Sequence, residues 1–221
     1  MTDLFKNTPQ SSGFNTSSFG QTPNKIYGLL QCIGNVSAEK CSDCAQQANN
    51  SLHEVCANSI GALIVMDDCF LRYDNSNFIS ILDINQFISL SNVNSISGNM
   101  DDFKATTSSL LYKLSNLAYN PANKRFSIGS ASYSPSHNVY GLVQCWRDLS
   151  INVCRKCLFT ARNTVENCCS AKEGAQAISP SCTVSFEIYQ FFDTIQSSSP
   201  LPSPEGSSAQ IQSKSKHNHF F

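Results

Sequence analysis

The most constraining feature of the sequence is a cysteine pattern that occurs twice. Each cysteine of the first pattern recurs 113 residues later in the second. The flanking residues repeat as well, because Tyr27-Gly-Leu-Leu-Gln-Cys32 matches Tyr140-Gly-Leu-Val-Gln-Cys145. Coincident offsets without a gap indicate a duplicated module. The matched cysteines are Cys32, Cys41, Cys44, Cys56 and Cys69 in the first copy, and Cys145, Cys154, Cys157, Cys169 and Cys182 in the second.

The cysteine content also limits the environment in which such a chain functions. Eleven of 221 residues are cysteine, which is unusual in the cytosol unless the thiols bind metal or undergo redox chemistry. The odd count, with Cys168 as the additional residue, leaves one thiol over if the others are paired. Only 14% of residues are charged and the net charge is -1, which argues against a nucleic-acid binder, since such a protein needs a basic face. The apolar runs are far shorter than the ~20 residues of a membrane span, which predicts no membrane insertion.

Hydrophobic periodicity predicts the elements of the second module. Residues 101–117 have apolar side chains at three- and four-residue steps, as in a helix with one buried face, and Asn120-Pro121 closes it. Ser150 offers an N-cap oxygen to a second helix. The predicted order is a helix at 101–117, strands at 126–133 and 139–146 with a turn at 136–138, a helix from 150 to about 166, and strands at 175–179 and 183–191.

Strands joined by short turns pair antiparallel, so the predicted fold class is α+β. Each of the two tandem modules is expected to pack two helices on an antiparallel sheet of about five strands, stapled by disulfides. Mapped back by 113 residues, Ser37 caps the helix of the first module, but the first helix is missing there. Residues 1–13 show no helical periodicity and no secretory signal, so we expect a leader, a helix and a cysteine to be encoded upstream. The predicted domains are 1–78 and 99–193, with a linker at 79–98 and a disordered Ser/Pro-rich tail at 194–221.

Three chemistries could use the Cys-x8-Cys-x2-Cys spacing. A structural zinc site would need further ligands at suitable spacing, and the four histidines do not supply them. Thioredoxin-like chemistry would need the first thiolate of Cys41-Ser-Asp-Cys44 or Cys154-Arg-Lys-Cys157 at a helix N-terminus, whereas both pairs fall inside a predicted helix. A disulfide framework fits a small secreted module, because each bridge stabilises the fold by roughly 2–4 kcal/mol. The framework is the favoured interpretation.

The repeated sequence motifs resemble those of a known plant family. The motif ending at Cys145, the Cys-x8-Cys-x2-Cys spacing and the Cys-x12-Cys step that closes each module are similar to the ginkbilobin-2-homologous, or salt stress response/antifungal, domain. Tandem copies resemble cysteine-rich repeat secretory proteins and the ectodomains of cysteine-rich receptor-like kinases. The segment from Cys168 to Phe192 is similar to the second domain of those kinases. The resemblance covers residues 14–192 and implies two helices against an antiparallel sheet, in agreement with the predicted elements.

The resemblance also implies how the cysteines pair. Cys56 would bond a cysteine near the start of the first helix, which this sequence lacks, so Cys56 is expected to be unpaired. Cys168 and Cys169 stay unassigned, with a vicinal bridge between them as one alternative. The implied bridges are Cys32–Cys41, Cys44–Cys69, Cys145–Cys154 and Cys157–Cys182.

The founding member of this family is a mannose-binding lectin whose site consists of an Asn, an Arg and a Glu. By resemblance the Arg position falls at Leu63 and Gln176, and the Glu position at Asp74 and Glu187. Neither module has the Asn. Because Leu63 cannot hydrogen-bond a sugar hydroxyl, we predict that the mannose site is degraded. Glu187 is then expected to be a surface strand residue.

The favoured function is a non-enzymatic extracellular binding module in plant stress or defence, without metal or cofactor. One alternative is a thiol-redox protein that uses the two Cys-x2-Cys pairs. Another is a truncated cysteine-rich receptor-like kinase without its kinase or transmembrane region. The expected partner is a cell-wall glycan or an extracellular protein, with self- or hetero-association through the sheet faces, and the resemblance implies an apoplastic location. The sequons at Asn15, Asn35 and Asn49 are glycosylation acceptors if the chain is secreted.

Overall fold

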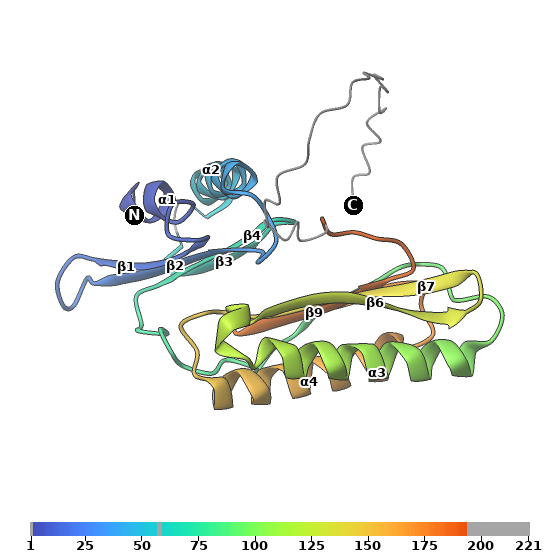
Figure 1. The fold of residues 1–221 in the computed structure, drawn as a ribbon. Helices are drawn as coiled ribbons and strands as arrows, with labels where there is room; N and C mark the ends of the chain where they lie inside the picture. Colours follow the sequence, from blue (N-terminus) through green and yellow to red (C-terminus); the bar gives the residue numbers. More distant parts are fainter. Residues whose placement is uncertain (1, 57–58, 194–221) are drawn as a thin grey trace, which may run out of the picture.

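Two helix-on-sheet modules make up the computed structural model, which describes residues 2–56 and 59–193 (Figure 1). The predicted α+β class is therefore confirmed. Module one contains α1 (Thr2–Asn7), β1 (Phe14–Phe19), β2 (Ile26–Cys32), α2 (Ala38–Val55), β3 (Ala62–Val65) and β4 (Cys69–Asp74). Module two contains β5 (Ile88–Ser91), α3 (Met100–Ala118), η1 (Pro121–Asn123), β6 (Phe126–Ser134), β7 (His137–Cys145), α4 (Ile151–Cys169), β8 (Gly174–Ile178) and β9 (Cys182–Glu187). The tail predicted at 194–221 lies outside the described residues.

The two sheets share one antiparallel topology. The strand order is β1-β2-β4-β3 in module one and β6-β7-β9-β8-β5 in module two. The register repeats too, since Cys32 faces Cys69 as Cys145 faces Cys182. Module one therefore has four strands, fewer than the five expected. The fifth strand of module two, β5, comes from the segment predicted as a linker and pairs with β8.

Equivalent serines begin the two long helices that carry the Cys-x2-Cys pairs. Ser37 Oγ accepts a hydrogen bond from the Lys40 amide at 3.2 Å, and Ser150 Oγ accepts one from the Val153 amide at 3.3 Å. Each bond satisfies one of the amides that a helix leaves unpaired at its first turn. The capping serines predicted from the sequence thus set where α2 and α4 begin.

The expectation that no helix precedes the first strand is wrong. α1 contacts α2, β1 and β2, as α3 contacts α4, β6 and β7, but it has 6 residues against the 19 of α3. The Leu4 side chain of α1 is fully buried in the core of module one, and Thr8 donates to the Leu4 carbonyl at 2.6 Å. A helix of fewer than two turns is too short to show a 3.6-residue periodicity, which explains why the sequence pattern missed it.

Two predicted boundaries in module two also differ from the structure. The turn between β6 and β7 is formed by Pro135 and Ser136 alone, so Asn138 belongs to β7, where its Oδ1 accepts from Ser132 at 2.6 Å. A two-residue hairpin turn needs no more chain than this. β9 ends at Glu187 rather than at 191. The following residues leave the sheet and run back towards module one (Figure 1).

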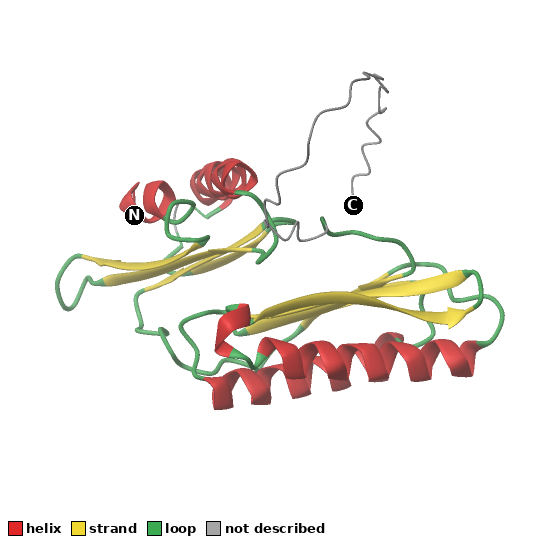
Figure 2. Ribbon diagram, in the orientation of Figure 1, coloured by secondary structure: helices red, strands yellow, loops and turns green. Residues whose placement is uncertain are grey.

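The sheets of the two modules face each other, with the helices on the outside (Figure 2). Each module has its own core between helix and sheet, and a third cluster lies where the modules meet. In this third cluster the Trp146 ring stacks on Phe70, with ring centroids 3.8 Å apart. The remaining buried members are Leu29 and Phe78. The sheet faces expected to mediate association thus partly cover one another within the chain.

Two glutamines hold the modules together in a reciprocal arrangement. Gln31 donates to the Cys145 carbonyl at 3.1 Å and accepts from the Arg147 amide at 2.8 Å. Gln144, its equivalent 113 residues later, donates to the Cys32 carbonyl at 3.1 Å and accepts from the Gly34 amide at 3.0 Å. Both glutamine side chains are buried. Each module therefore satisfies main-chain groups that the other would otherwise bury unpaired.

Candidate functional site

In module one, the positions that the resemblance assigns to the sugar site are Leu63 and Asp74, and the structure shows what each of them contacts. Leu63 on β3 packs against the apolar cluster between the modules. Arg72 lies opposite it on β4, but its guanidinium pairs with Asp83 at 3.0 Å and lies 4.3 Å from the centre of the Phe78 ring. Asp74 Oδ1 accepts from the Ser76 amide at 2.8 Å. The one guanidinium near the expected Arg position is already engaged.

The equivalent positions in module two retain polar groups but lack the guanidinium. Gln176 on β8 donates to the Thr183 hydroxyl at 3.3 Å. Glu187, predicted to be a surface strand residue, lies on β9, and its side chain is partly buried. It faces Gly174, where an added Cβ atom would collide with the Glu187 carboxylate. Burial, followed by repulsion from Glu173, raises the pKa of Glu187 from 4.5 to about 7. Glu187 is therefore half protonated near neutral pH, which weakens it as an acceptor for sugar hydroxyls.

Ten of the cysteines are bonded in the structure. The four bridges implied by the resemblance are all present, and a fifth joins the adjacent Cys168 and Cys169. The two members of each Cys-x2-Cys pair bond different partners, so neither pair is a dithiol that could cycle between two redox states. Among the described residues Cys56, at the end of α2, is the free cysteine, and its carbonyl accepts from the Tyr73 hydroxyl at 3.2 Å.

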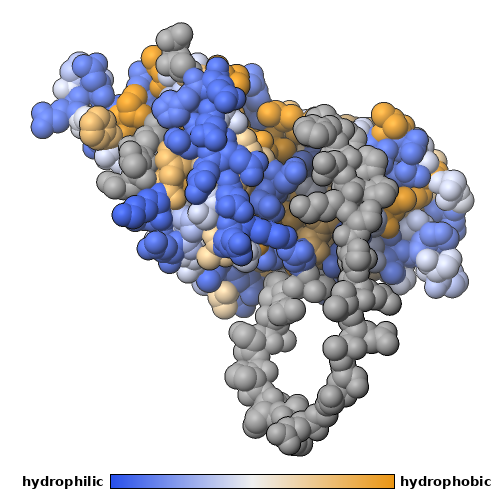
Figure 3. Space-filling view, turned by 90° about the horizontal axis from the view of Figure 1, so that it is seen from above, coloured by the Kyte–Doolittle hydropathy of each residue, from blue (hydrophilic) through white to orange (hydrophobic). Residues whose placement is uncertain are grey.

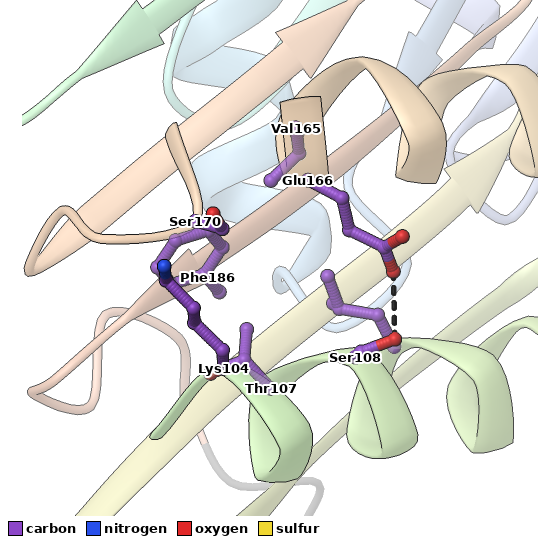
Figure 4. Close-up of a pocket in the computed structure, with 8 residues that line it drawn as sticks. Lys104, Thr107, Ser108, Val165, Glu166, Ser170 and Phe186 are labelled. Carbon is purple, nitrogen blue, oxygen red and sulfur yellow. Dashed lines mark hydrogen bonds between the residues drawn. The ribbon is translucent and has the colours of Figure 1, made fainter. Parts of the chain in front are cut away.

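A small cavity lies between α3 and α4 (Figure 4). Its volume is about 10 Å³, room for a single water molecule. Ser108 donates to Glu166 across the helix pair at 2.7 Å, while the buried Thr107 hydroxyl has no partner among the described residues. A water on Thr107 would satisfy that hydroxyl. The cavity is a packing feature and too small for a ligand.

A larger groove opens at the junction of the modules. Its volume is about 320 Å³, which lies at the lower end of the range for small-ligand sites. Gly34 of module one lines it, and a Cβ atom there would overlap the Phe126 ring, so this close approach requires glycine. Polar groups come from Asn123, Lys124 and Ser127. The other lining residues are Ala122 and Ile128. Residues 122–128 of module two form most of the groove, and Gly34 of module one completes its lining.

The segment after β9 ties the end of module two to module one. The Asp193 carboxylate accepts a 2.6 Å hydrogen bond from Lys40 Nζ, which raises the pKa of Lys40. The Asp193 main-chain carbonyl accepts a hydrogen bond from Asn35 Nδ2 at 2.9 Å. Asn35 is one of the three sequons, so a glycan on its nitrogen would displace this bond. Asn15 and Asn49 are partly exposed on β1 and α2. In the face shown in Figure 3, hydrophobic residues occur in small groups among hydrophilic ones.

The described residues contain neither a metal site nor a membrane span. Within 2–56 and 59–193 no group of three or more His, Cys, Asp or Glu side chains is arranged to hold a metal ion. None of the helices in these ranges combines the length and the hydropathy that crossing a bilayer requires.

The fold and the five disulfides define a tandem cysteine-rich protein of two similar modules, and comparisons with known proteins agree. The profile of the salt stress response/antifungal family matches residues 1–76 and 90–189, so the chain belongs to this family. An antimicrobial ginkbilobin-2-like protein from Castanea crenata is 38% identical over 86% of this chain and 78% of its own length. Cysteine-rich repeat secretory protein 38 from Arabidopsis thaliana is 34% identical over 83% of this chain and 73% of its own length.

The fold itself matches solved structures. The tandem DUF26 ectodomain of the Arabidopsis thaliana cysteine-rich receptor-like protein PDLP8 has a TM-score of 0.74 at 23% identity, covering 86% of both chains. Cysteine-rich receptor-like protein kinase 14 of Arabidopsis thaliana is also similar, at 30% identity, but the chain spans only 32% of its length. The family membership predicted from the cysteine spacing is confirmed.

Sequence reasoning missed the residues that form the module junction. Gln31 and Gln144 precede the first cysteine of each module, inside the very motif that reveals the duplication. A polar side chain repeated within an otherwise apolar strand pattern was a signal for a shared buried role. Lys124 and Ser127 carried no such signal, because only the packing of one module on the other brings them beside Gly34.

Proposed function

We propose that the protein is a non-enzymatic extracellular binding module of plant stress or defence, and that it binds its ligand in the junction groove. The groove supports this proposal because its volume of about 320 Å³ can hold a small ligand and residues of both modules line it. Its mixture of amide, hydroxyl and ammonium groups beside Ile128 is the kind of lining that orients a small polar ligand. A short cell-wall oligosaccharide fits this chemistry, with an acidic group beside Lys124.

An extracellular location is part of the proposal. Disulfides persist in oxidising compartments, and relatives of this chain include a secretory protein. The redox alternative finds no support in the cross-pairing of the Cys-x2-Cys motifs. Titration of the unfolded, unreduced protein should count one free thiol per chain, and Cys56→Ser should remove it. A count near eleven would instead establish the reduced, redox-type protein.

A glycan array on the secreted, disulfide-intact protein tests the ligand class and the site together. We expect oligosaccharide binding that falls at least tenfold in Lys124→Ala and stays unchanged in Glu187→Ala, with mannose absent from the ligands. Lys113→Ala on the outer helix α3 is the matched control for loss of a positive charge. Mannose binding abolished by Glu187→Ala would show that the family's sugar site persists. The absence of any glycan ligand would favour an extracellular protein as the partner.

A further inference from the structure

One long side of β5 is unpaired in the described part of the chain. β5 lies at the edge of the module-two sheet, pairs only with β8, and all four of its residues are exposed. The amide of Asn92, just beyond β5, donates to the Gly174 carbonyl on β8 at 2.9 Å. Because hydrogen-bonding direction alternates along an antiparallel strand, Leu90 also bonds towards β8. Ser89 and Ser91 therefore direct their amides and carbonyls to the free side.

The side chains of β5 form a short aliphatic row on the sheet. Ile88 pairs with the buried Ile178 and Leu90 with Gln176, so both lie on the face of the sheet opposite the helices. Ile88 is 50% exposed and Leu90 is 54% exposed. From Ile84 to Met100 the chain has no charged residue. Backbone groups and side chains of β5 are thus both available for pairing.

The other sheet edges carry features that discourage pairing, and β5 does not. Natural edge strands are protected by charges, bulges or bulky cover. β6 has a register shift between Ser132 and Ser134 and follows Lys124-Arg125. β3 is followed by Asp67-Asp68, and β1 contains the sequon at Asn15. All three sequons belong to module one, so glycans would leave the β5 edge clear.

We propose that β5 pairs antiparallel with β5 of a second copy of this chain, across a two-fold axis, to form one sheet through two molecules. The edge is complementary to itself. With Leu90 opposite Leu90 of the second copy, Ser89 of each copy lies opposite Ser91 of the other. Each outward amide of β5 then donates to an outward carbonyl of the second strand. The same register keeps the leucines in contact on one face. This interface is separate from the junction groove and does not depend on ligand binding.

Sedimentation equilibrium of the disulfide-intact chain tests the dimer. Because the contact is one short strand, we expect a weak dimer with a Kd on the order of 10–100 µM. Leu90→Lys should raise the Kd at least tenfold, and Ser91→Pro, which removes an outward amide, should do the same while circular dichroism stays unchanged. Phe19→Lys, at a 74% exposed position on the β1 edge, is the control and should leave the dimer intact. A monomer at millimolar concentration, or a dimer insensitive to Leu90→Lys, would overturn the proposal.

Cross-linking tests the register. In a Cys56→Ser background, Leu90→Cys should form a disulfide-linked dimer on mild oxidation, since directly opposed residues of a non-hydrogen-bonded pair have Cα atoms about 4.5 Å apart. Ile88→Cys, two residues off the axis, should cross-link at least tenfold more slowly. Equal cross-linking of both variants would rule out this register, whereas selective cross-linking of Leu90→Cys supports it even if the equilibrium dimer is weak.

Discussion

At the scale of single residues, Glu187 is a partly buried carboxylate with a raised pKa. The resemblance assigns the Glu position of the sugar site to this residue on β9 and the Arg position to Gln176, which donates to the Thr183 hydroxyl. Its Oε2 is buried and has no hydrogen-bond partner among the described residues. The missing Cβ of Gly174 leaves the space in which the carboxylate lies. Ionisation of Glu187 near neutral pH therefore lowers the stability of the fold.

The raised pKa of Glu187 predicts a pH dependence of stability. Between pH 4.5 and about 7 the folded state keeps a proton that the unfolded state releases, so the free energy of unfolding falls as the pH rises through this window. Glu187→Gln should remove this loss. Allowing for solvent screening, we expect the variant to gain about 1–2 kcal/mol over the wild type at pH 8 and nothing at pH 4. Urea unfolding at both pH values measures this, with the exposed Glu54→Gln as control. An equal gain at both pH values would contradict it.

At the scale of elements, the helices of the two modules are built alike but packed differently. Besides its cysteines, α2 buries only two alanines, whereas α4 buries one alanine together with Leu158 and Val165. The apolar core of module one is accordingly smaller than that of module two, and Leu4 of the short α1 belongs to it. Helix caps contribute equally to both, because the capping serine recurs at the same distance before the first helical cysteine.

The caps give a prediction at this scale. Ser150→Ala leaves the Val153 amide without its acceptor and should cost about 1 kcal/mol of unfolding free energy. Ser150→Asp should restore most of it, because a carboxylate caps the same amide and favours the positive end of the helix. Ser109→Ala, exposed inside α3, is the control and should be neutral or slightly stabilising. Urea unfolding measures all three, and an equal loss in Ser150→Asp would exclude the capping role.

At the scale of the whole molecule, the reciprocal glutamines make one unit out of two modules. Each glutamine side chain hydrogen-bonds a main-chain carbonyl and a main-chain amide of the other module, and both groups are thereby shielded from water. The stacked pair Phe70 and Trp146 lies in the same interface, and Trp146 is the sole tryptophan of the chain. Its fluorescence is therefore a direct reporter of module separation.

Loss of one glutamine should loosen this interface. Gln31→Ala and Gln144→Ala each leave a buried carbonyl and a partly buried amide without their partner, which should cost about 2–3 kcal/mol. Trp146 fluorescence should then change at lower urea than far-ultraviolet circular dichroism, since the modules separate before they unfold. The exposed Gln47→Ala is the control. Coincident transitions and a cost no larger than that of Gln47→Ala would refute the role of the glutamines.

Much of the fold could be predicted from the sequence because its signals are local. The spacing of the cysteines revealed the duplication, helix periodicity revealed α3, and the capping serines marked where α2 and α4 begin. The same local signals were too weak for α1, which is stabilised by the burial of Leu4, and for β5, which exists as a strand because β8 offers it a hydrogen-bonding edge.

The sequence alone determined that the chain is a disulfide-rich duplicated module of this family, and it predicts that Leu63 does not serve a mannose site. The tertiary structure decided how the modules meet: Gln31 and Gln144 exchange hydrogen bonds with the opposite module, Gly34 admits the Phe126 ring, and β5 joins the second sheet with one side free. These features depend on residues about ninety or more positions apart in the sequence, or on which strand is left at an edge. Spacing along the chain constrains local structure, whereas such contacts arise only when the two folded modules pack together.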